Sequence, residues 1–291
     1  SWDNITAKGQ FPALADRYVV WGDCMAEELK AYYRVTENKL VRVGVPHFDL
    51  HVRARANPDP QPARDLGLDP SRPYLFFAMS APRYCPREID IVEWLTARVG
   101  EGTLTNGLQL LVRPHPQNMT GDMADTSWLP RLKALEKIPG VHLFYPDLHK
   151  DSRLLYSMAR TELSTFSQLL AGAAVVLNSG STVSIDALMA GRPVILTSFD
   201  AEEELTYWRS ARRLIDYTHL KQFVACGGVR VTRSFADLEQ AVITYLQAPE
   251  TDRTAREATT ERYCYRRDGR ATERAVAFYQ ELVHDLSSKR K

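Results

Sequence analysis

The chain lacks most features that mark secreted, membrane-spanning or nucleic-acid-binding proteins. Its 291 residues include only four cysteines (Cys24, Cys85, Cys226 and Cys264), and their spacing fits neither a disulfide framework nor a metal site. No apolar run approaches the roughly eighteen residues of a membrane span, and the opening residues do not read as a signal peptide. The 37 basic and 36 acidic residues leave a net charge of +1, which does not favour nucleic acid as a partner. We expect a cytoplasmic protein, with at most a peripheral association at the inner face of the membrane.

Several well-known catalytic motifs are missing as well. There is no C-x-x-C, H-E-x-x-H or G-x-S-x-G pattern, which argues against zinc, redox and serine-hydrolase chemistry. Neither common phosphate loop, G-x-x-x-x-G-K-[ST] or G-x-G-x-x-G, occurs. The nearest approach to an acidic D-x-D metal motif, Glu88-Ile89-Asp90, opens a predicted helix instead of following a strand. We therefore expect no bound metal and no cofactor.

What is present is a regular alternation of short apolar runs and helical patterns. With 44% hydrophobic residues, the chain can bury a full core. Strands are expected at 17–22, 39–45, 74–79, 108–112, 141–145, 173–177, 193–196 and 227–231. Helices are expected at 24–34, 86–99, 128–137, 163–171, 183–190, 235–245 and 271–286. This order predicts a largely parallel, doubly wound α/β sheet. Residues 54–72 are rich in proline and charge and are predicted to be the most flexible loop.

The stretch 173–196, AAVVLNSGSTVSIDALMAGRPVIL, is the most informative part of the sequence. An apolar strand is followed by turn residues, and Ser181 or Thr182 can cap a helix that ends at Gly191. A turn of this kind aims backbone N–H groups and two hydroxyls at one point, which favours a bound phosphate. Ser and Gly also occur in such turns for purely structural reasons, and this alternative stays open.

Two further residues fit the same site. Asp186 lies four residues after Thr182 on one helix face, where its carboxylate could accept hydrogen bonds from a ribose diol. An acid exposed in the first turns of the helix is the alternative. His115 stands between two prolines directly after a buried strand, in Arg113-Pro114-His115-Pro116. The prolines present its ring, protonated or hydrogen-donating, at the sheet edge where α/β proteins bind ligands. A surface-turn histidine is the alternative, and Arg113 either assists His115 or pairs with a carboxylate.

The motif in 178–195, NSGSTVSIDALMAGRPVI, resembles the donor-binding signature of GT-B glycosyltransferases, S-T-x-x-x-E-A-x-x-x-G-x-P-V-I. Asp186 stands where the family usually has Glu. The nearest relatives by this resemblance are bacterial surface-polysaccharide transferases, including CDP-glycerol glycerophosphotransferases, and the UDP-N-acetylglucosamine 2-epimerases share the fold. Gly44, Pro46 and Asp49 match a G-x-P-x-x-D pattern that joins the two GT-B halves, and a plain turn set by Gly and Pro is the alternative. Asp268-Gly269-Arg270-Ala271 matches a D-G-x-A that precedes the last helix in the glycerophosphotransferase-like relatives.

The resemblance implies the Rossmann-like, C-terminal donor-binding half of a GT-B enzyme. It implies metal-independent transfer from a nucleotide-activated sugar or CDP-glycerol to a glycan or glycolipid acceptor, in surface or capsular polysaccharide synthesis. His115 would assist the departing nucleotide, and Asp186 would bind the ribose. The remaining donor-binding residues would be Arg113, Ser179, Gly180, Ser181, Thr182, Gly44 and Pro46. In inverting relatives the general base sits on the other half, so none is assigned here.

Domain organisation follows from the same reading. Because Ser1-Trp2-Asp3-Asn4 does not read as a natural start, we expect a fragment whose N-terminal half is missing. Residues 1–16 would be the linker from that half, 17–268 the donor-binding domain, and 269–291 a helix and tail that cross back to the N-terminal half. Two other functions stay open: an epimerase-like reaction on a UDP-sugar, and a non-catalytic nucleotide-binding domain of a larger polysaccharide-synthesis protein.

Overall fold

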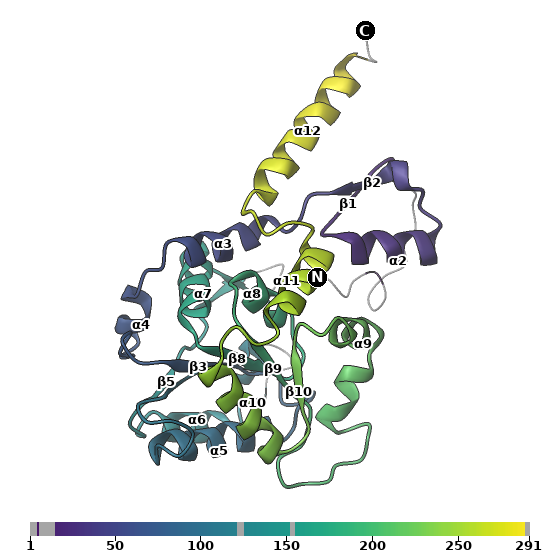
Figure 1. Ribbon diagram of the computed structural model, residues 1–291. Helices are drawn as coiled ribbons and strands as arrows, with labels where there is room; N and C mark the ends of the chain where they lie inside the picture. The colour runs from purple at the N-terminus through teal and green to yellow at the C-terminus, as the bar shows by residue number, and fades with distance from the viewer. Residues whose placement is uncertain (1–4, 6–14, 121–124, 152–154, 289–291) are drawn as a thin grey trace.

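The computed structural model describes residues 5, 15–120, 125–151 and 155–288. Its centre is a six-stranded sheet with the strand order β10-β9-β8-β3-β4-β5 (Figure 1), and all neighbouring strands in it are parallel. The strands are β3 Tyr74–Ala78, β4 Gln109–Arg113, β5 Val141–Leu143, β8 Val175–Asn178, β9 Val194–Thr197 and β10 Arg230–Thr232. The predicted parallel α/β sheet is therefore confirmed.

The strand order places the first strand of this sheet in its middle. From β3 the chain moves outward through β4 and β5, then returns to β8 and continues outward through β9 and β10 on the other side. The order thus reverses between β3 and β8. In open α/β sheets ligands bind in the crevice outside the carboxyl ends of the strands at such a switch point.

Helices cover both faces of the sheet because its strands are apolar on both faces. On β3, Phe76 and Ala78 join one buried cluster, while Leu75 and Phe77 join the other. The second cluster lies under α5 Glu88–Gly100, α6 Leu129–Leu135 and α10 Phe235–Gln247. The first lies under α7 Arg160–Gly172, α8 Val183–Met189, α9 Thr218–Ala225 and α11 Arg253–Cys264. The chain is therefore doubly wound, as the sequence predicts.

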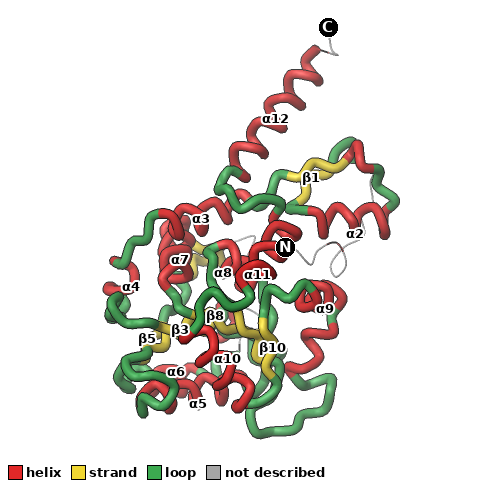
Figure 2. The backbone as a smooth tube through the Cα atoms, viewed as in Figure 1, coloured by secondary structure: helices red, strands yellow, loops and turns green. Residues whose placement is uncertain are grey.

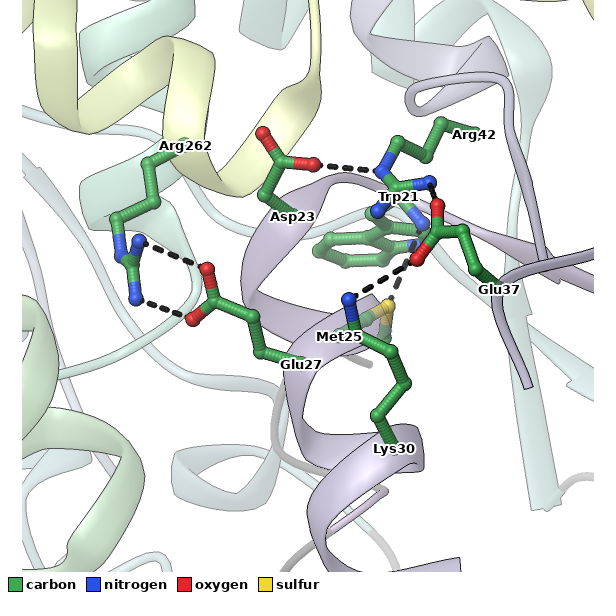
Figure 3. A network of polar contacts seen from close by, with 8 residues as sticks. All are labelled: Trp21, Asp23, Met25, Glu27, Lys30, Glu37, Arg42 and Arg262. Atoms are coloured by element: carbon green, nitrogen blue, oxygen red, sulfur yellow. Dashed lines mark hydrogen bonds and ion pairs between the residues drawn. The ribbon is translucent and has the colours of Figure 1, made fainter. Parts of the chain in front are cut away.

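A small unit outside the main sheet contains β1 Tyr18–Val20, α2 Asp23–Tyr33 and β2 Leu40–Arg42, with its own apolar cluster. Figure 3 shows its polar contacts. Arg42 pairs with Asp23 at 2.6 Å and with Glu37 at 2.5 Å, and Glu27 on α2 pairs with Arg262 on α11 at 2.6 Å. Exposed pairs such as these contribute at most about 1 kcal/mol each, so they orient the unit more than they stabilise it.

Some elements differ from the expectation. The predicted flexible loop at 54–72 contains the end of α3 Asp49–Ala56 and the helix α4 Gln61–Asp65. This prediction was wrong because prolines that suggest a loop are also accepted in the first turn of a helix, as in α4. Sequence reasoning also missed α9, α11 and an antiparallel pair, β6 Leu148–Asp151 and β7 Leu155–Met158. Short 3₁₀ helices complete the fold: η1 Glu37–Lys39, η2 Pro46–Phe48, η3 Pro116–Asn118 and η4 Ala211–Asp216.

The last helix, α12 Ala271–Ser288, extends away from the sheet on the side of the small unit (Figures 1 and 2). Val276, Tyr279 and Val283 are exposed along it. Among the described residues, no helix is long and apolar enough to cross a membrane. Most of the linker predicted at 1–16 lies outside the described residues.

Candidate donor-binding site

A cavity of about 370 Å³ opens at the carboxyl end of the sheet, beside the switch point. Its walls come from the ends of β3 and β4, from η2 and α3, and from the first turns of α7 and α8. Three predicted residues, Arg113, His115 and Asp186, meet there although they are far apart in the sequence. A volume of this size is typical of a pocket for a small organic ligand.

His115 is held in one orientation by the turn that follows it. Its Nδ1 accepts a hydrogen bond from the backbone N–H of Gln117 at 3.1 Å, and its own N–H donates to Oδ1 of Asn118 at 2.6 Å. Because Nδ1 acts as an acceptor, a neutral ring carries its proton on Nε2. The residue is therefore a prepared hydrogen-bond donor at the cavity wall.

The surroundings keep this imidazole uncharged. Burial, followed by the positive charges of Arg83 and Arg113, lowers the pKa of His115 to about 4. At neutral pH the ring is thus neutral, and of the two forms that the sequence analysis considered, the hydrogen-donating one is favoured over the protonated one. An anionic ligand beside the ring would raise this pKa by its charge.

Arg113 pairs with a carboxylate, which was the alternative for this residue. Its guanidinium donates to Oε1 of Glu162 on α7 and lies over the rings of Phe144 and Phe166, at 4.3 and 5.2 Å from their centroids. The other oxygen of Glu162 accepts from the backbone N–H of Asp147 at 3.1 Å. The pair adds little net charge to the cavity, and the effect of Arg113 there is its contribution to the lowered pKa of His115.

Asp186 also has a partner that the sequence did not reveal. Its Oδ1 lies 2.8 Å from Nε2 of His51 on α3, and the His51 side chain is only 3% exposed. Among the described residues, Oδ2 of Asp186 accepts no hydrogen bond and Nδ1 of His51 has no partner. One carboxylate oxygen is therefore fixed, and the other is available to a ligand.

His47 and His51 are functional candidates that sequence reasoning missed. They stand four residues apart, His47 in η2 and His51 in α3, and both line the cavity. Burial lowers the pKa of His47. Their spacing, directly after the G-x-P motif, was the available signal. No group of three or more His, Cys, Asp or Glu side chains converges as metal ligands anywhere in the described ranges.

The turn before α8 is organised by Asn178. Its Oδ1 accepts the N–H groups of Gly180 and Ser181, each at 2.8 Å, and the hydroxyl of Ser184 at 3.1 Å. Gly180 adopts φ +103°, a region that favours glycine. Thr182 occupies the N-cap position, but its side chain makes no capping bond. Two of the N–H groups expected to face a phosphate are thus already used inside the turn.

The hydroxyl of Ser179 points into the protein. It donates to Oε1 of Glu88 at 2.6 Å and lies 2.8 Å from the hydroxyl of Thr197, while Oε2 of Glu88 accepts from the N–H of Ser80 at 2.6 Å. Burial raises the pKa of Glu88 to about 7. This network ties the turn to the loop after β3 and to β9. Residues 179–182 do not line the cavity, whereas Val183, next in the chain, does.

Gly44 and Pro46 lie outside the cavity wall and pack against the start of α12. Gly44 has φ +86°, and a Cβ there would come within 3.0 Å of the carbonyl oxygen of Cys264. The carboxylate of Asp49 accepts the N–H groups of Ala271 at 2.9 Å and Thr272 at 2.8 Å. The motif therefore anchors η2 and α3, the segment that presents His47 and His51 to the cavity.

Comparison with known proteins adds information at the level of the fold. No protein-family model matches the chain, and no curated protein matches it in sequence. Solved structures do match, among them the wall teichoic acid polymerase TagF, with 12% identity, a TM-score of 0.58 and 94% of this chain covered. UDP-GlcNAc 2-epimerase from Neisseria meningitidis, bound to UDP-GlcNAc, matches with 12% identity, a TM-score of 0.55 and 92% covered. A putative UDP-N-acetylglucosamine 2-epimerase from Listeria monocytogenes matches with 15% identity, a TM-score of 0.59 and 93% covered.

The chain has a GT-B-type fold. Identities this low show the fold and nothing finer. The match covers 58% of the TagF chain, 62% of the Neisseria epimerase and 60% of the Listeria protein. The described chain therefore spans about three-fifths of the length of these GT-B proteins.

Proposed function

We propose that this chain is the donor-binding part of a GT-B-type transferase that uses a nucleotide-activated sugar, or CDP-glycerol, in surface or capsular polysaccharide synthesis. One observation carries the proposal: two residues line the same cavity at the switch point of a GT-B-type sheet. They are His115, which is neutral and held in one orientation, and Asp186, whose carboxylate has one oxygen bound to His51 and the other available. A nucleotide donor needs both kinds of group. Its diphosphate accepts hydrogen bonds, and its ribose hydroxyls donate them.

The geometry supports a specific division of roles. Nε2–H of His115 would donate to a diphosphate oxygen, and Oδ2 of Asp186 would accept from a ribose hydroxyl while His51 holds Oδ1. As the bond between the transferred group and the diphosphate breaks, negative charge grows on the leaving nucleotide. A donor already aimed at that charge lowers the barrier because it needs no reorganisation. Ser181 and Thr182, on the turn before α8, remain the candidates for further phosphate contacts.

Transfer also needs an acceptor and a base, and neither is assigned to these residues. We propose that an N-terminal GT-B half of the same protein supplies them, and that the reaction needs no protein-bound metal. Holding acceptor and donor together can contribute roughly 7–11 kcal/mol to lowering the barrier. This chain alone should therefore bind a nucleotide without measurable transfer, and joining it to that half should restore transfer.

The direct test is a binding panel. Thermal unfolding and calorimetry would be measured with UDP, CDP, CMP, GDP, ADP, UDP-GlcNAc and CDP-glycerol. A ligand at about a hundred times its dissociation constant adds roughly 2.7 kcal/mol to the unfolding free energy. We expect one base to be preferred, and diphosphates to bind more tightly than the monophosphate. Failure of every nucleotide to bind would exclude the proposed function, and transfer by the chain alone would exclude the need for a second half.

A UDP-sugar 2-epimerase-like reaction is the second candidate. The His51–Asp186 pair at the cavity wall favours it, because epimerisation at C2 requires a base that removes a carbon-bound proton. Incubation with UDP-GlcNAc in deuterated water distinguishes the two reactions. Deuterium incorporated at C2 indicates epimerase chemistry, and its absence alongside tight UDP-GlcNAc binding favours the transferase.

A further inference from the structure

A second cavity, of about 380 Å³, lies towards the other end of the two helices that carry the His51–Asp186 pair. On α3, Arg55 follows His51 by one turn and faces this second cavity. Gly191, directly after α8, is also part of its wall. The charged side chains that line it are Arg55, Arg253, Arg256, Arg267, Glu250 and Glu257.

The positive charges in this cavity outnumber the negative ones. Arg253 pairs with Glu250 at 2.8 Å and with Glu257 at 3.3 Å, and Arg267 shares Glu257 at 3.0 Å. Arg256 is buried and donates to two backbone carbonyls, which carry no net charge. Two carboxylates thus face four guanidinium groups.

Arg55 is the least compensated of the four. Among the described residues it has no carboxylate within ion-pair distance, and its side chain makes no hydrogen bond. Burial, and then the charge of Arg267, lowers the pKa of Arg55, and the attraction of Glu257 offsets this only in part. Nε of Arg267 is also buried without a hydrogen-bond acceptor. The cavity therefore holds an excess of positive charge, and at Arg267 Nε a buried donor with no hydrogen-bond acceptor among the described residues.

The backbone makes room for this arrangement at Gly191. A Cβ there would lie 2.9 Å from Cδ of Arg55, and φ is +80°. A neighbouring cavity of about 460 Å³ shares Gly191, Glu250 and Arg256 with this second cavity and adds Arg72 and Arg192. The adjoining space is large enough for a second phosphate group.

We propose that this arginine cavity binds a phosphate-type oxyanion, as free phosphate or pyrophosphate or as the phosphate group of a larger molecule. The planar guanidinium fork matches the oxygens of phosphate and binds them in pairs. A dianion would balance the two excess positive charges. The site is separate from the donor cavity and does not depend on the proposed function. It is joined to that cavity by α3 and α8.

Calorimetry with inorganic phosphate and with pyrophosphate, at constant ionic strength, tests the proposal. Arg55→Gln should lower the affinity for both anions by about tenfold or more, since a hydrogen bond to a charged group is lost. It should fold normally, because Arg55 has no described internal partner. Arg64→Gln, at an exposed position on α4, is the matched control and should bind like the wild type.

Two further experiments identify which cavity binds the phosphate and whether the phosphate belongs to a lipid. His115→Asn removes any anion binding in the donor cavity, so phosphate binding that survives this change and is lost in Arg55→Gln belongs to the arginine cavity. If His115→Asn abolishes that binding while Arg55→Gln does not, or if Arg55→Gln binds like the wild type, the proposal is wrong. The second experiment uses vesicles containing phosphatidic acid. If the wild type sediments with these vesicles and Arg55→Gln does not, the ligand is a lipid headgroup. If the protein binds phosphate but does not sediment with the vesicles, the ligand is a soluble oxyanion.

Discussion

The sharpest test of the donor site separates the two nitrogens of His115. Nδ1 holds the turn by accepting the Gln117 N–H, and Nε2–H is the group that we propose donates to the ligand. Asparagine can place an amide oxygen near the position of Nδ1 but has nothing at the position of Nε2. Glutamine reaches the position of Nε2 but loses the contact to Gln117. His115→Asn should therefore keep the turn and lose the ligand contact. His115→Gln should keep the ligand contact and lose the hydrogen bond that holds the turn.

The expected magnitude follows from the charge of the ligand. A hydrogen bond to a charged group contributes roughly 1.5–3 kcal/mol, which corresponds to about a 10- to 150-fold change in affinity. His115→Asn should weaken UDP-GlcNAc or CDP-glycerol binding by this factor. The bare nucleoside should bind almost unchanged because it has no phosphate to contact.

The pH dependence adds a second readout. With a pKa of about 4, His115 is already neutral at pH 6, so wild-type affinity should stay flat between pH 6 and pH 8. Below that range affinity should rise, because the bound diphosphate favours a protonated ring; an internal diphosphate has no ionisation of its own near pH 6. His115→Asn should show no such rise.

The measurement is isothermal titration calorimetry from pH 4.5 to 8, with the unfolding temperature recorded for each variant. An equal loss for nucleoside and diphosphate in His115→Asn would mean that the ring does not face the phosphates. A steady fall in wild-type affinity from pH 6 to 8 would mean that the ring binds in its charged form. Either result would refute the reasoning.

Three other changes test neighbouring parts of the structure. Asp186→Asn should lower the affinity for ribonucleotides, measured by calorimetry, and leave the affinity for 2′,3′-dideoxynucleotides unchanged. Equal affinity of the wild type for both would contradict the ribose role. The raised pKa of Glu88 means that the native state binds the extra proton between about pH 4.5 and 7. The unfolding free energy of the wild type, measured in urea relative to that of Glu88→Gln, should therefore fall as pH rises through that window. Asp49→Ala should cost about 1–2 kcal/mol, as for a lost helix cap, and expose the start of α12 to proteolysis; unchanged cleavage there would contradict the anchoring role.

Much of the main sheet could be predicted because its strands are buried on both faces. Such strands appear as continuous apolar runs, and β3, β4, β8 and β9 were all placed from them. α11 was missed because its sequence, RTAREATTERYC, has few apolar residues with which to form a periodic pattern. Its packing comes from Arg256, Thr259 and Thr260, which are polar and nevertheless buried.

The candidate site could be predicted only where strand ends bring residues together. The carboxyl ends of parallel strands share one edge, so Arg113 and His115 could be placed near Asp186 in advance. The direction in which each side chain points could not be predicted. Nothing in N-S-G-S-T says that Ser179 turns inward to Glu88, which is 91 residues away. The His51–Asp186 pair joins residues 135 apart, and local patterns contain no information about such contacts.

The G-x-P-x-x-D and D-G-x-A motifs, read separately in the sequence, form one joint in the structure. Asp49 accepts two N–H groups at the start of α12, and Arg274 on α12 donates to the carbonyl of Val43 at 2.9 Å while pairing with Asp268 at 2.7 Å. Hydrogen bonds to a buried carboxylate are strong and directional, so α12 and the η2–α3 segment should move together. His47 and His51 lie on that segment and line the donor cavity. A rotation of α12 would therefore shift His51, the partner of Asp186, and with it the ribose contact that we propose for this carboxylate.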